Sequence, residues 1–256
     1  MDAVADRLDS TTALVTGASS GIGEAAALSL AALGADLAVV ARRADRLDDL
    51  ADRIRTSGRS CVVIPADVTD ERQATRAVQE TLEALGRLDT VVNNAGLMLL
   101  GPTLDSPTDE WRRMVELNLL GVMYVARAAL PHLLAAADTA PRRVADLVNI
   151  SSVAGRQVRV GSAVYNATKH GVGAFSEALR QEVTARHVRV SLVEPGATDT
   201  ALVSHNRDAV RPTIEGRYAQ IERLQARDVA ETIGFIVTRP RHVSLSEVLI
   251  RPTEQV

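Results

Sequence analysis

Thr16-Gly17-Ala18-Ser19-Ser20-Gly21-Ile22-Gly23 follows a short apolar run, Thr12 to Val15, and opens an apolar helical pattern that runs to about Leu33. Glycines in such a turn let the backbone approach a bound pyrophosphate closely, and the helix N-terminus offers unpaired N–H groups and a positive dipole. Many Gly-rich turns are only turns, and methyltransferases also carry one after their first strand. The place between a first strand and a first helix nevertheless favours a nucleotide-like cofactor.

Strand and helix patterns alternate along the rest of the chain. Continuous apolar strands separated by helix-length connections predict a parallel sheet covered on both faces, an α/β fold that is doubly wound, with ligands beyond the carboxyl ends of the strands. We expect an irregular, polar region from Pro195 to about Arg217 and a polar loop over Asp138 to Arg143. The further strands are predicted at Asp36 to Ala41, Ser60 to Pro65, Thr90 to Asn93, Val144 to Ile150, Val188 to Val193 and near Val248 to Ile250. The further helices are predicted at Arg46 to Ser57, Asp70 to Leu85, Pro107 to Ala136, Ala163 to Arg186 and Asp228 to Val237.

Composition narrows the class of protein. The 256 residues, 46% hydrophobic and 24% charged with a net charge of −3, are typical of one globular domain spanning 1–256 and give no electrostatic sign of a nucleic-acid or anionic-membrane partner. The longest apolar stretch, Leu117 to Ala137, contains Arg127, Pro131 and His132 and is a poor membrane span. Cys61 is the only cysteine, and the histidines lack metal-ligand spacing, so we expect no metal. The N-terminus shows no signal segment, and we expect a cytoplasmic protein.

The second predicted strand ends in Ala41-Arg42-Arg43. A site for NAD would place an acidic residue here to accept from the adenosine ribose hydroxyls, whereas the guanidinium groups of arginines suit the 2′-phosphate of NADP. The alternative is a solvated pair of arginines at a helix entry. Because the acid is also missing, we favour NADP(H).

Tyr165 and Lys169 stand at i and i+4 on one face of a predicted helix, and Lys169 is the only lysine among 29 basic residues. An ammonium beside a phenol favours phenolate and would lower the pKa of Tyr165. Taken alone, the pair is most simply explained as a chance arrangement of two surface residues. Together with the Gly-rich turn, it predicts proton transfer coupled to hydride transfer.

These motifs, in this order, resemble those of the short-chain dehydrogenase/reductase family along nearly the whole chain. Thr16 to Gly23 matches the family's cofactor turn, Asn93-Asn94-Ala95-Gly96 its motif after the fourth strand, and Pro195-Gly196 with Thr198 to Thr200 its nicotinamide-side loop. The resemblance implies a Rossmann-type sheet of about seven strands in a three-layer sandwich. It also implies a substrate lid at about 197–218 and a homotetramer.

Four catalytic roles follow from the resemblance. Tyr165 would exchange a proton with the substrate oxygen, while Lys169 would bind the nicotinamide ribose and lower the pKa of Tyr165. Ser152, rather than Ser151, would hold the substrate oxygen. Asn118 would hold a water that links Lys169 to solvent; its alternative is a polar kink that satisfies backbone groups inside a helix.

The resemblance also implies a set of cofactor-binding residues. Asp67 would bind the adenine amino group, with backbone contact from Val68, unless Asp67 is a helix N-cap. The full set for NADP(H) is Gly17, Ser19, Ser20, Gly21, Ile22, Gly23, Arg42, Arg43, Asp67, Val68, Asn94, Ala95, Gly96, Tyr165, Lys169, Pro195, Gly196, Thr198 and Thr200.

A small-molecule substrate would bind among Met98, Leu99, Val153 to Val160 and Ala201 to Tyr218. Arg156, Arg159 and Arg207 could pair with a substrate carboxylate, or they could be solvated loop arginines. Several further segments, among them Val193 to Thr200 and the tail Ile250 to Thr253, resemble a typically tetrameric subgroup of NADP-dependent 3-hydroxy acid (serine-type) and clavulanic acid dehydrogenases. The loop from Asp138 to Arg143 looks longer than usual in that subgroup, and Ser204 to Tyr218 has no residue-by-residue match.

The leading interpretation is an NADP-dependent oxidoreductase that interconverts an alcohol and a carbonyl. Cells usually hold NADP reduced, which favours carbonyl reduction. One alternative is a non-catalytic nucleotide-sensing or scaffolding protein, which would tolerate the loss of Tyr165, Lys169 or Ser152, yet all are present. Another is a methyltransferase, which would require an acidic residue where Arg42 stands and leaves the Tyr165 and Lys169 pair unexplained.

Overall fold

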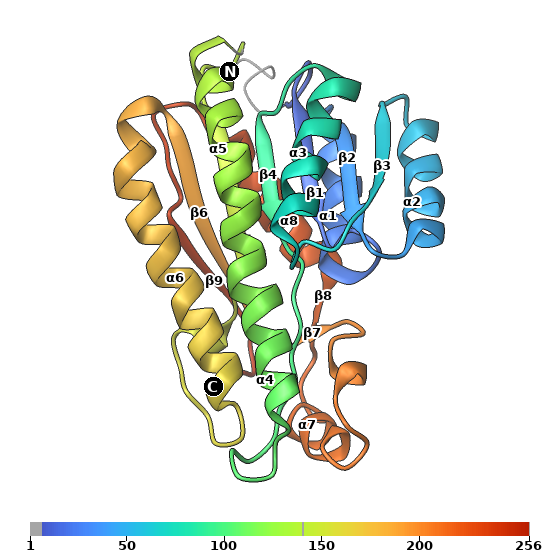
Figure 1. Ribbon diagram of the computed structural model, residues 1–256, viewed down its shortest axis with the longest axis vertical. Coiled ribbons are helices and arrows are strands. Elements are labelled where there is room, and N and C mark those ends of the chain that lie inside the picture. The colour runs from blue at the N-terminus through green and yellow to red at the C-terminus, as the bar shows by residue number, and fades with distance from the viewer. Residues whose placement is uncertain (1–6, 140, 256) are drawn as a thin grey trace.

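The computed structural model describes residues 7–139 and 141–255. These residues form a seven-stranded sheet of order β3-β2-β1-β4-β5-β6-β9, parallel throughout (Figure 1). The strand order reverses between β1 and β4, which confirms the predicted doubly wound sheet. The strands are β1 (Thr12–Thr16), β2 (Asp36–Ala41), β3 (Cys61–Pro65), β4 (Thr90–Asn93), β5 (Ala145–Ile150), β6 (Val188–Pro195) and β9 (Glu247–Ile250).

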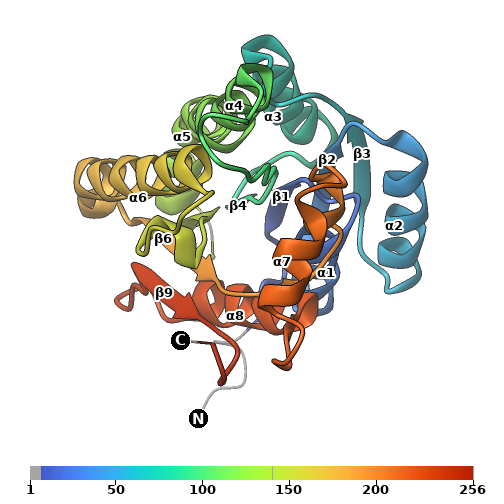
Figure 2. The same cartoon turned by 90° about the horizontal axis from the view of Figure 1, so that it is seen from below.

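Helices cover both faces of the sheet, as predicted (Figure 2). Alternate residues of one strand enter different cores: Val15 packs with α1, α2 and α8, whereas Leu14 packs with α3, α5 and α6. Because both faces are covered, the strands are apolar without polar alternation. The helices are α1 (Gly21–Ala32), α2 (Ala44–Thr56), α3 (Glu71–Leu85), α5 (Val122–Thr139), α6 (Ala163–Val183) and α8 (Ala226–Thr238).

One long helical segment runs from α4 (Thr108–Val115) through a π-helical stretch, η1 (Glu116–Gly121), into α5. It continues to Thr139, so Asp138 and Thr139, which were expected in a loop, belong to the helix. By length and composition alone, Thr108–Thr139 is long and apolar enough to cross a membrane. In the fold, α5 packs against α3, β4 and β5.

The region after β6 is more regular than predicted. A short parallel pair, β7 (Thr198–Asp199) with β8 (Leu224–Gln225), closes a segment that contains α7 (Arg211–Arg217). We call residues 200–223 the flap. The prediction of an irregular region was wrong here, because two-residue strands are too short to show a periodic pattern and only tertiary pairing defines them.

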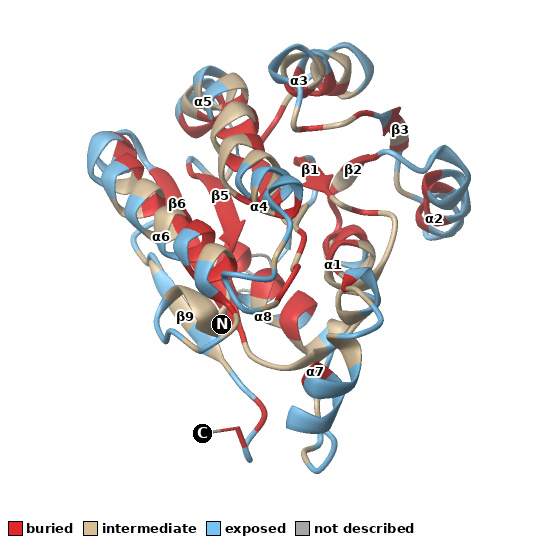
Figure 3. Cartoon of the chain, turned by 60° about the horizontal axis from the view of Figure 1, so that its bottom comes forward, coloured by how far each residue is buried: buried red, intermediate tan, exposed pale blue. Residues whose placement is uncertain are grey.

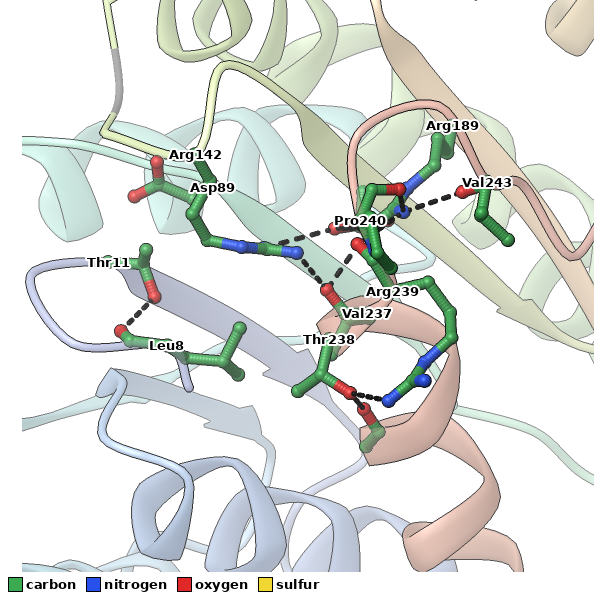
Figure 4. A network of polar contacts seen from close by, with 12 residues as sticks. Leu8, Thr11, Asp89, Arg142, Arg189, Val237, Thr238, Arg239, Pro240 and Val243 are labelled. Carbon is green, nitrogen blue, oxygen red and sulfur yellow. Dashed lines mark hydrogen bonds and ion pairs between the residues drawn. The ribbon is translucent and has the colours of Figure 1, made fainter. Parts of the chain in front are cut away.

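Arg189 takes part in a network of polar contacts (Figure 4), and its buried ion pair with a carboxylate ties together the amino ends of β5 and β6. Arg189 on β6 donates to both oxygens of Asp146 on β5, from Nε at 2.7 Å and Nη2 at 2.9 Å. The guanidinium also donates to the carbonyl oxygens of Val237 at 3.1 Å and Val243 at 2.8 Å, at and beyond the end of α8. Arg142 lies 3.5 Å from the same carboxylate. The Asp146 carboxylate therefore neutralises the buried Arg189 and the nearby Arg142 at the amino ends of the strands.

We expect Asp146→Asn to lower the free energy of unfolding by about 3–5 kcal/mol, because it leaves buried arginines without a counter-charge. Urea unfolding measures the change. The matched control, Asp138→Asn, removes an exposed partner of Arg186 at 2.8 Å and should cost less than about 1 kcal/mol. A similarly small loss in both variants would contradict this role of Asp146.

Candidate active site

A cavity of about 580 Å³ opens at the carboxyl ends of the strands. The residues predicted to bind the cofactor line it, apart from Gly23, together with Ser152, Tyr165 and Lys169; Asn118 does not. Figure 3 brings this end of the molecule forward: strands β1, β5 and β6 are buried, whereas the edge strand β9 and most of α7 on the flap are not. The fold thus gathers in one place segments that are far apart in the sequence.

The Gly-rich turn passes directly under the end of β4. A side chain at Gly17 would put its Cβ 2.8 Å from Ala95 Cα, and one at Gly23 would lie 2.4 Å from Asn94 Nδ2. Gly17 also has a φ of +65°, which other residues rarely adopt. Gly23 therefore acts through the closeness of the turn to β4 and not by lining the cavity.

The N-terminus of α1 faces the cavity without a side-chain cap, since Ser20 at the N-cap accepts no hydrogen bond from the helix. The first N–H groups of this helix are consequently free to bind an anion, where the helix dipole favours negative charge.

Arg43 lies over the turn and donates from Nη2 to Ser19 Oγ at 2.9 Å and Ser20 Oγ at 3.1 Å. Arg42 is exposed, and its Nη1 lies 3.8 Å from Asp67 Oδ2. Asp67 accepts from Thr69 N at 3.0 Å and Thr69 Oγ1 at 2.8 Å. The N-cap of α3 is Asp70, so the alternative that Asp67 caps this helix is wrong.

Tyr165 and Lys169 lie one turn apart on α6, and both are buried. Lys169 Nζ donates to the carbonyl of Ile150 at 2.9 Å and lies 5.9 Å from the centroid of the Tyr165 ring. Ser152 caps the short helix η2 (Val153–Gly155), and its Oγ also donates to Pro195 O at 3.4 Å. Ser151 instead donates to the carbonyl of Lys169 at 3.2 Å. Of the two serines, Ser152 is the one that acts on the pKa of the phenol.

Burial is the largest influence on the pKa values of Tyr165 and Lys169. It raises the pKa of Tyr165 to about 12, against a smaller lowering by the hydrogen bond with Ser152. It also lowers the pKa of Lys169 to about 8. We expected Lys169 to lower the pKa of Tyr165, but the ammonium is directed to the Ile150 carbonyl. In the protein alone the phenol is thus held in its protonated form.

Asn118 lies in η1 and is fully buried. Its Nδ2 donates to Leu97 O at 2.8 Å, and its Oδ1 accepts from Leu97 N at 2.7 Å. The side chain thus satisfies backbone groups, as in the alternative interpretation, although those groups belong to the loop after β4 and not to its own helix. A Cβ at Gly96 would lie 3.5 Å from Asn118 Oδ1 and 3.8 Å from Lys169 Nζ, so both side chains lie beside Gly96.

The rest of the cavity is mostly apolar, with Met98, Leu100, Ile214 and Tyr218 among its lining. Two of the arginines considered for a substrate carboxylate already have acidic partners. Arg156 pairs with Glu194 and Glu247, and Arg207 lies 3.1 Å from Glu110. Arg159 lines the cavity.

Within the described part of the chain, no group of three or more His, Cys, Asp or Glu side chains could hold a metal ion.

Since the buried Lys169 has a pKa of about 8, the unfolded chain, with the ordinary lysine pKa of 10.5, binds more protons between these values. Stability must therefore rise with pH across this window, and the folded protein carries the full penalty below pH 8. We expect the free energy of unfolding to increase from pH 8 to about pH 9.5 and the increase to be smaller in Lys169→Met. An identical pH dependence in both proteins, measured by urea unfolding, would refute the burial of an ionisable Lys169.

Comparison with known proteins places the chain in a family. It is 34% identical over 245 residues to an uncharacterized oxidoreductase of Staphylococcus aureus, covering 96% of this chain and 98% of that one. A short chain dehydrogenase from Burkholderia cenocepacia, solved in complex with NADP, is 31% identical with a TM-score of 0.83, covering 96% and 98% of the two chains. The closed form of a serine dehydrogenase complexed with NADP⁺ is 29% identical with a TM-score of 0.84, covering 96% of each chain. The family model for short chain dehydrogenases matches residues 11–211, and the chain belongs to this family of oxidoreductases.

Proposed function

We propose that the protein is an NADP(H)-dependent oxidoreductase that interconverts an alcohol and a carbonyl on a small substrate and works as an aldehyde or ketone reductase. The observation that carries the proposal is the buried Tyr165, one helical turn from Lys169 and in the same cavity as Ser152 and the Gly-rich turn. Two structural relatives are complexed with NADP or NADP⁺, which supports the choice of cofactor.

The residues that line the cavity would hold each part of such a cofactor. The uncapped N-terminus of α1 and the close turn at Gly17 would hold the pyrophosphate. Arg42 and Arg43 directly follow β2, in the place where a site for a ribose diol has an acidic residue, and would hold the 2′-phosphate. Asp67 and Val68 would contact the adenine, while Pro195, Gly196, Thr198 and Thr200 would line the nicotinamide end.

Bound NADPH would supply the hydride to the carbonyl carbon. Tyr165 would give its phenolic proton to the carbonyl oxygen, which Ser152 would hold by a hydrogen bond. A phenol whose pKa is raised by burial carries its proton at neutral pH but is a weak acid, so bound cofactor and substrate would have to favour the proton transfer. Lys169 would bind the nicotinamide ribose. Asn118, which lies beside Gly96 as Lys169 does, would hold a water that returns the proton from solvent.

A non-catalytic nucleotide-sensing protein is the second candidate. It needs the turn and the two arginines but gives no reason to bury Tyr165 and Lys169 in the same cavity as Ser152. Desolvating two ionisable groups costs stability, and an acid and base function accounts for that cost.

The proposal also includes the surroundings of the site. Residues 1–256 would form one cofactor-binding domain with a lid at about 197–218, a range within which α7 and most of the flap fall. The protein would be a cytoplasmic homotetramer that acts on small molecules and binds neither nucleic acid nor membrane.

Tyr165→Phe removes the proton donor and keeps the ring. We expect turnover of a carbonyl substrate to fall by at least about 100-fold. The dissociation constant of NADPH should stay within about threefold, since the lost hydroxyl is assigned to the substrate. Assays on aldehydes and β-keto acids, with nicotinamide fluorescence for binding, measure both quantities. Tyr124→Phe, on α5 outside the cavity, is the control, and unimpaired turnover in Tyr165→Phe would end the acid and base assignment.

Titration with NADPH and NADH tests the cofactor choice. The wild type should bind NADPH more tightly than NADH, and Arg42→Ala should weaken NADPH by about 10- to 100-fold, because a charge-assisted contact to the 2′-phosphate is lost. NADH, which lacks that phosphate, should be unaffected. Arg46→Ala, exposed on α2 outside the cavity, serves as the control. An equal loss for both cofactors would refute the 2′-phosphate assignment, and no binding of either would remove the proposed function.

A further inference from the structure

The C-terminal tail returns from β9 to the carboxyl end of β6. Gly196 N donates to Ile250 O at 2.7 Å, and a turn with Gln255 N donating to Pro252 O at 3.0 Å directs the chain back toward the cavity. Gln255 is buried. A glutamine side chain is ordinarily exposed, so its burial needs a cause.

That cause is a hydrogen bond to the loop after β6. Gln255 Oε1 accepts from Ala197 N at 2.8 Å. Because the partner is a donor, the orientation of this amide follows from the contact. The neighbouring glycine makes room for it: a Cβ at Gly196 would lie 2.3 Å from Gln255 Oε1. Gly196 and Ala197 both line the cavity, whereas Gln255 does not, so the Gln255 amide supports the cavity wall from outside.

The preceding residue holds the far end of the flap. Glu254 Oε2 accepts from Glu222 N at 3.0 Å, two residues before β8. Between these points, Leu224 N donates to Ala197 O at 3.0 Å, and β7 pairs with β8. The adjacent side chains of Glu254 and Gln255 therefore bind the backbone at two points, just before β8 and just before β7.

We infer that Gln255 is a positioning residue for the cofactor loop and that, with Glu254, it forms a clasp that fixes both ends of the flap. This inference rests on the proposed function, in which Gly196 and its neighbours line the nicotinamide end. Gln255 holds the Ala197 amide so that the loop keeps one conformation. Glu254 fixes the backbone just before β8. Only the residues between β7 and β8 are then left to move.

The test compares two substitutions of nearly equal size. Gln255→Met keeps the length of the side chain and removes the acceptor, whereas Gln255→Glu keeps an oxygen that accepts from Ala197 N in either protonation state. Thr253→Val changes an exposed residue of the same tail and is the control. Two quantities are measured: hydrogen exchange of the peptide containing Ala197 in the protein without cofactor, and the dissociation constant of NADPH.

We expect Gln255→Met to speed exchange at Ala197 and to weaken NADPH by about 3- to 10-fold, the size of one lost hydrogen bond. Gln255→Glu and Thr253→Val should stay within about twofold of the wild type in both measurements. Unchanged NADPH affinity in Gln255→Met overturns the inference, even if exchange is faster. Equal loss in Gln255→Glu also overturns it, because the acceptor would then not be what matters.

Two further outcomes are distinguishable. If Gln255→Met does not fold, Gln255→Asn, which shortens the side chain by one methylene group and withdraws the acceptor, is judged by the same two measurements. If the wild type binds no NADPH, the proposed function fails, and the cofactor role of the clasp fails with it. A wild type that binds NADPH, with a Gln255→Met variant that binds equally well, refutes the clasp alone.

Discussion

The carboxyl ends of β1 and β4 are joined side by side, and the site is built around this junction. Thr16 Oγ1 accepts from Asn94 N and Ala95 N, both at 3.1 Å, while Asn94 Nδ2 donates to Thr16 O at 3.1 Å. Glycine at positions 17 and 23 allows the two segments to approach this closely. Since the strand order reverses here, the connections leave toward opposite faces and open a crevice. The uncapped start of α1 and the end of β4 then face the same cavity.

Inside this crevice, burial affects the protonation of Tyr165 and Lys169 more than the nearness of their charges does. Tyr165 and Lys169 are one turn apart, yet the ammonium donates to the Ile150 carbonyl, and desolvation moves the two pKa values toward the neutral forms. A protonated phenol suits reduction, in which the oxygen of the substrate gains a proton. Lowering the pKa of Tyr165 for the reverse reaction would need a further positive charge in the cavity. Oxidised nicotinamide would bring such a charge.

The fold separates a densely buried support from an exposed flap. At the amino ends of the strands, the buried Arg189 and Asp146 pair connects β5, β6 and the residues after α8. At the carboxyl ends, the flap is largely exposed and joins the sheet through β7, β8 and the tail. Local stability follows the density of buried contacts, so opening of the cavity is expected in the flap and not in the sheet.

Sequence by itself determined the order of strands and helices and the doubly wound sheet, because apolar periodicity and glycine placement act over short stretches of chain. The residues expected around the cofactor followed from the resemblance to a family, and nearly all of them line the cavity. The sequence did not reveal β7, β8 or the burial of Gln255, which depend on contacts between residues far apart in the chain. The contacts of Asn118 with Leu97 and the acidic partners of Arg156 have the same origin. The direction of the Tyr165 pKa shift was likewise decided by the tertiary structure, since spacing places a charge nearby but only packing removes water and aims the ammonium elsewhere.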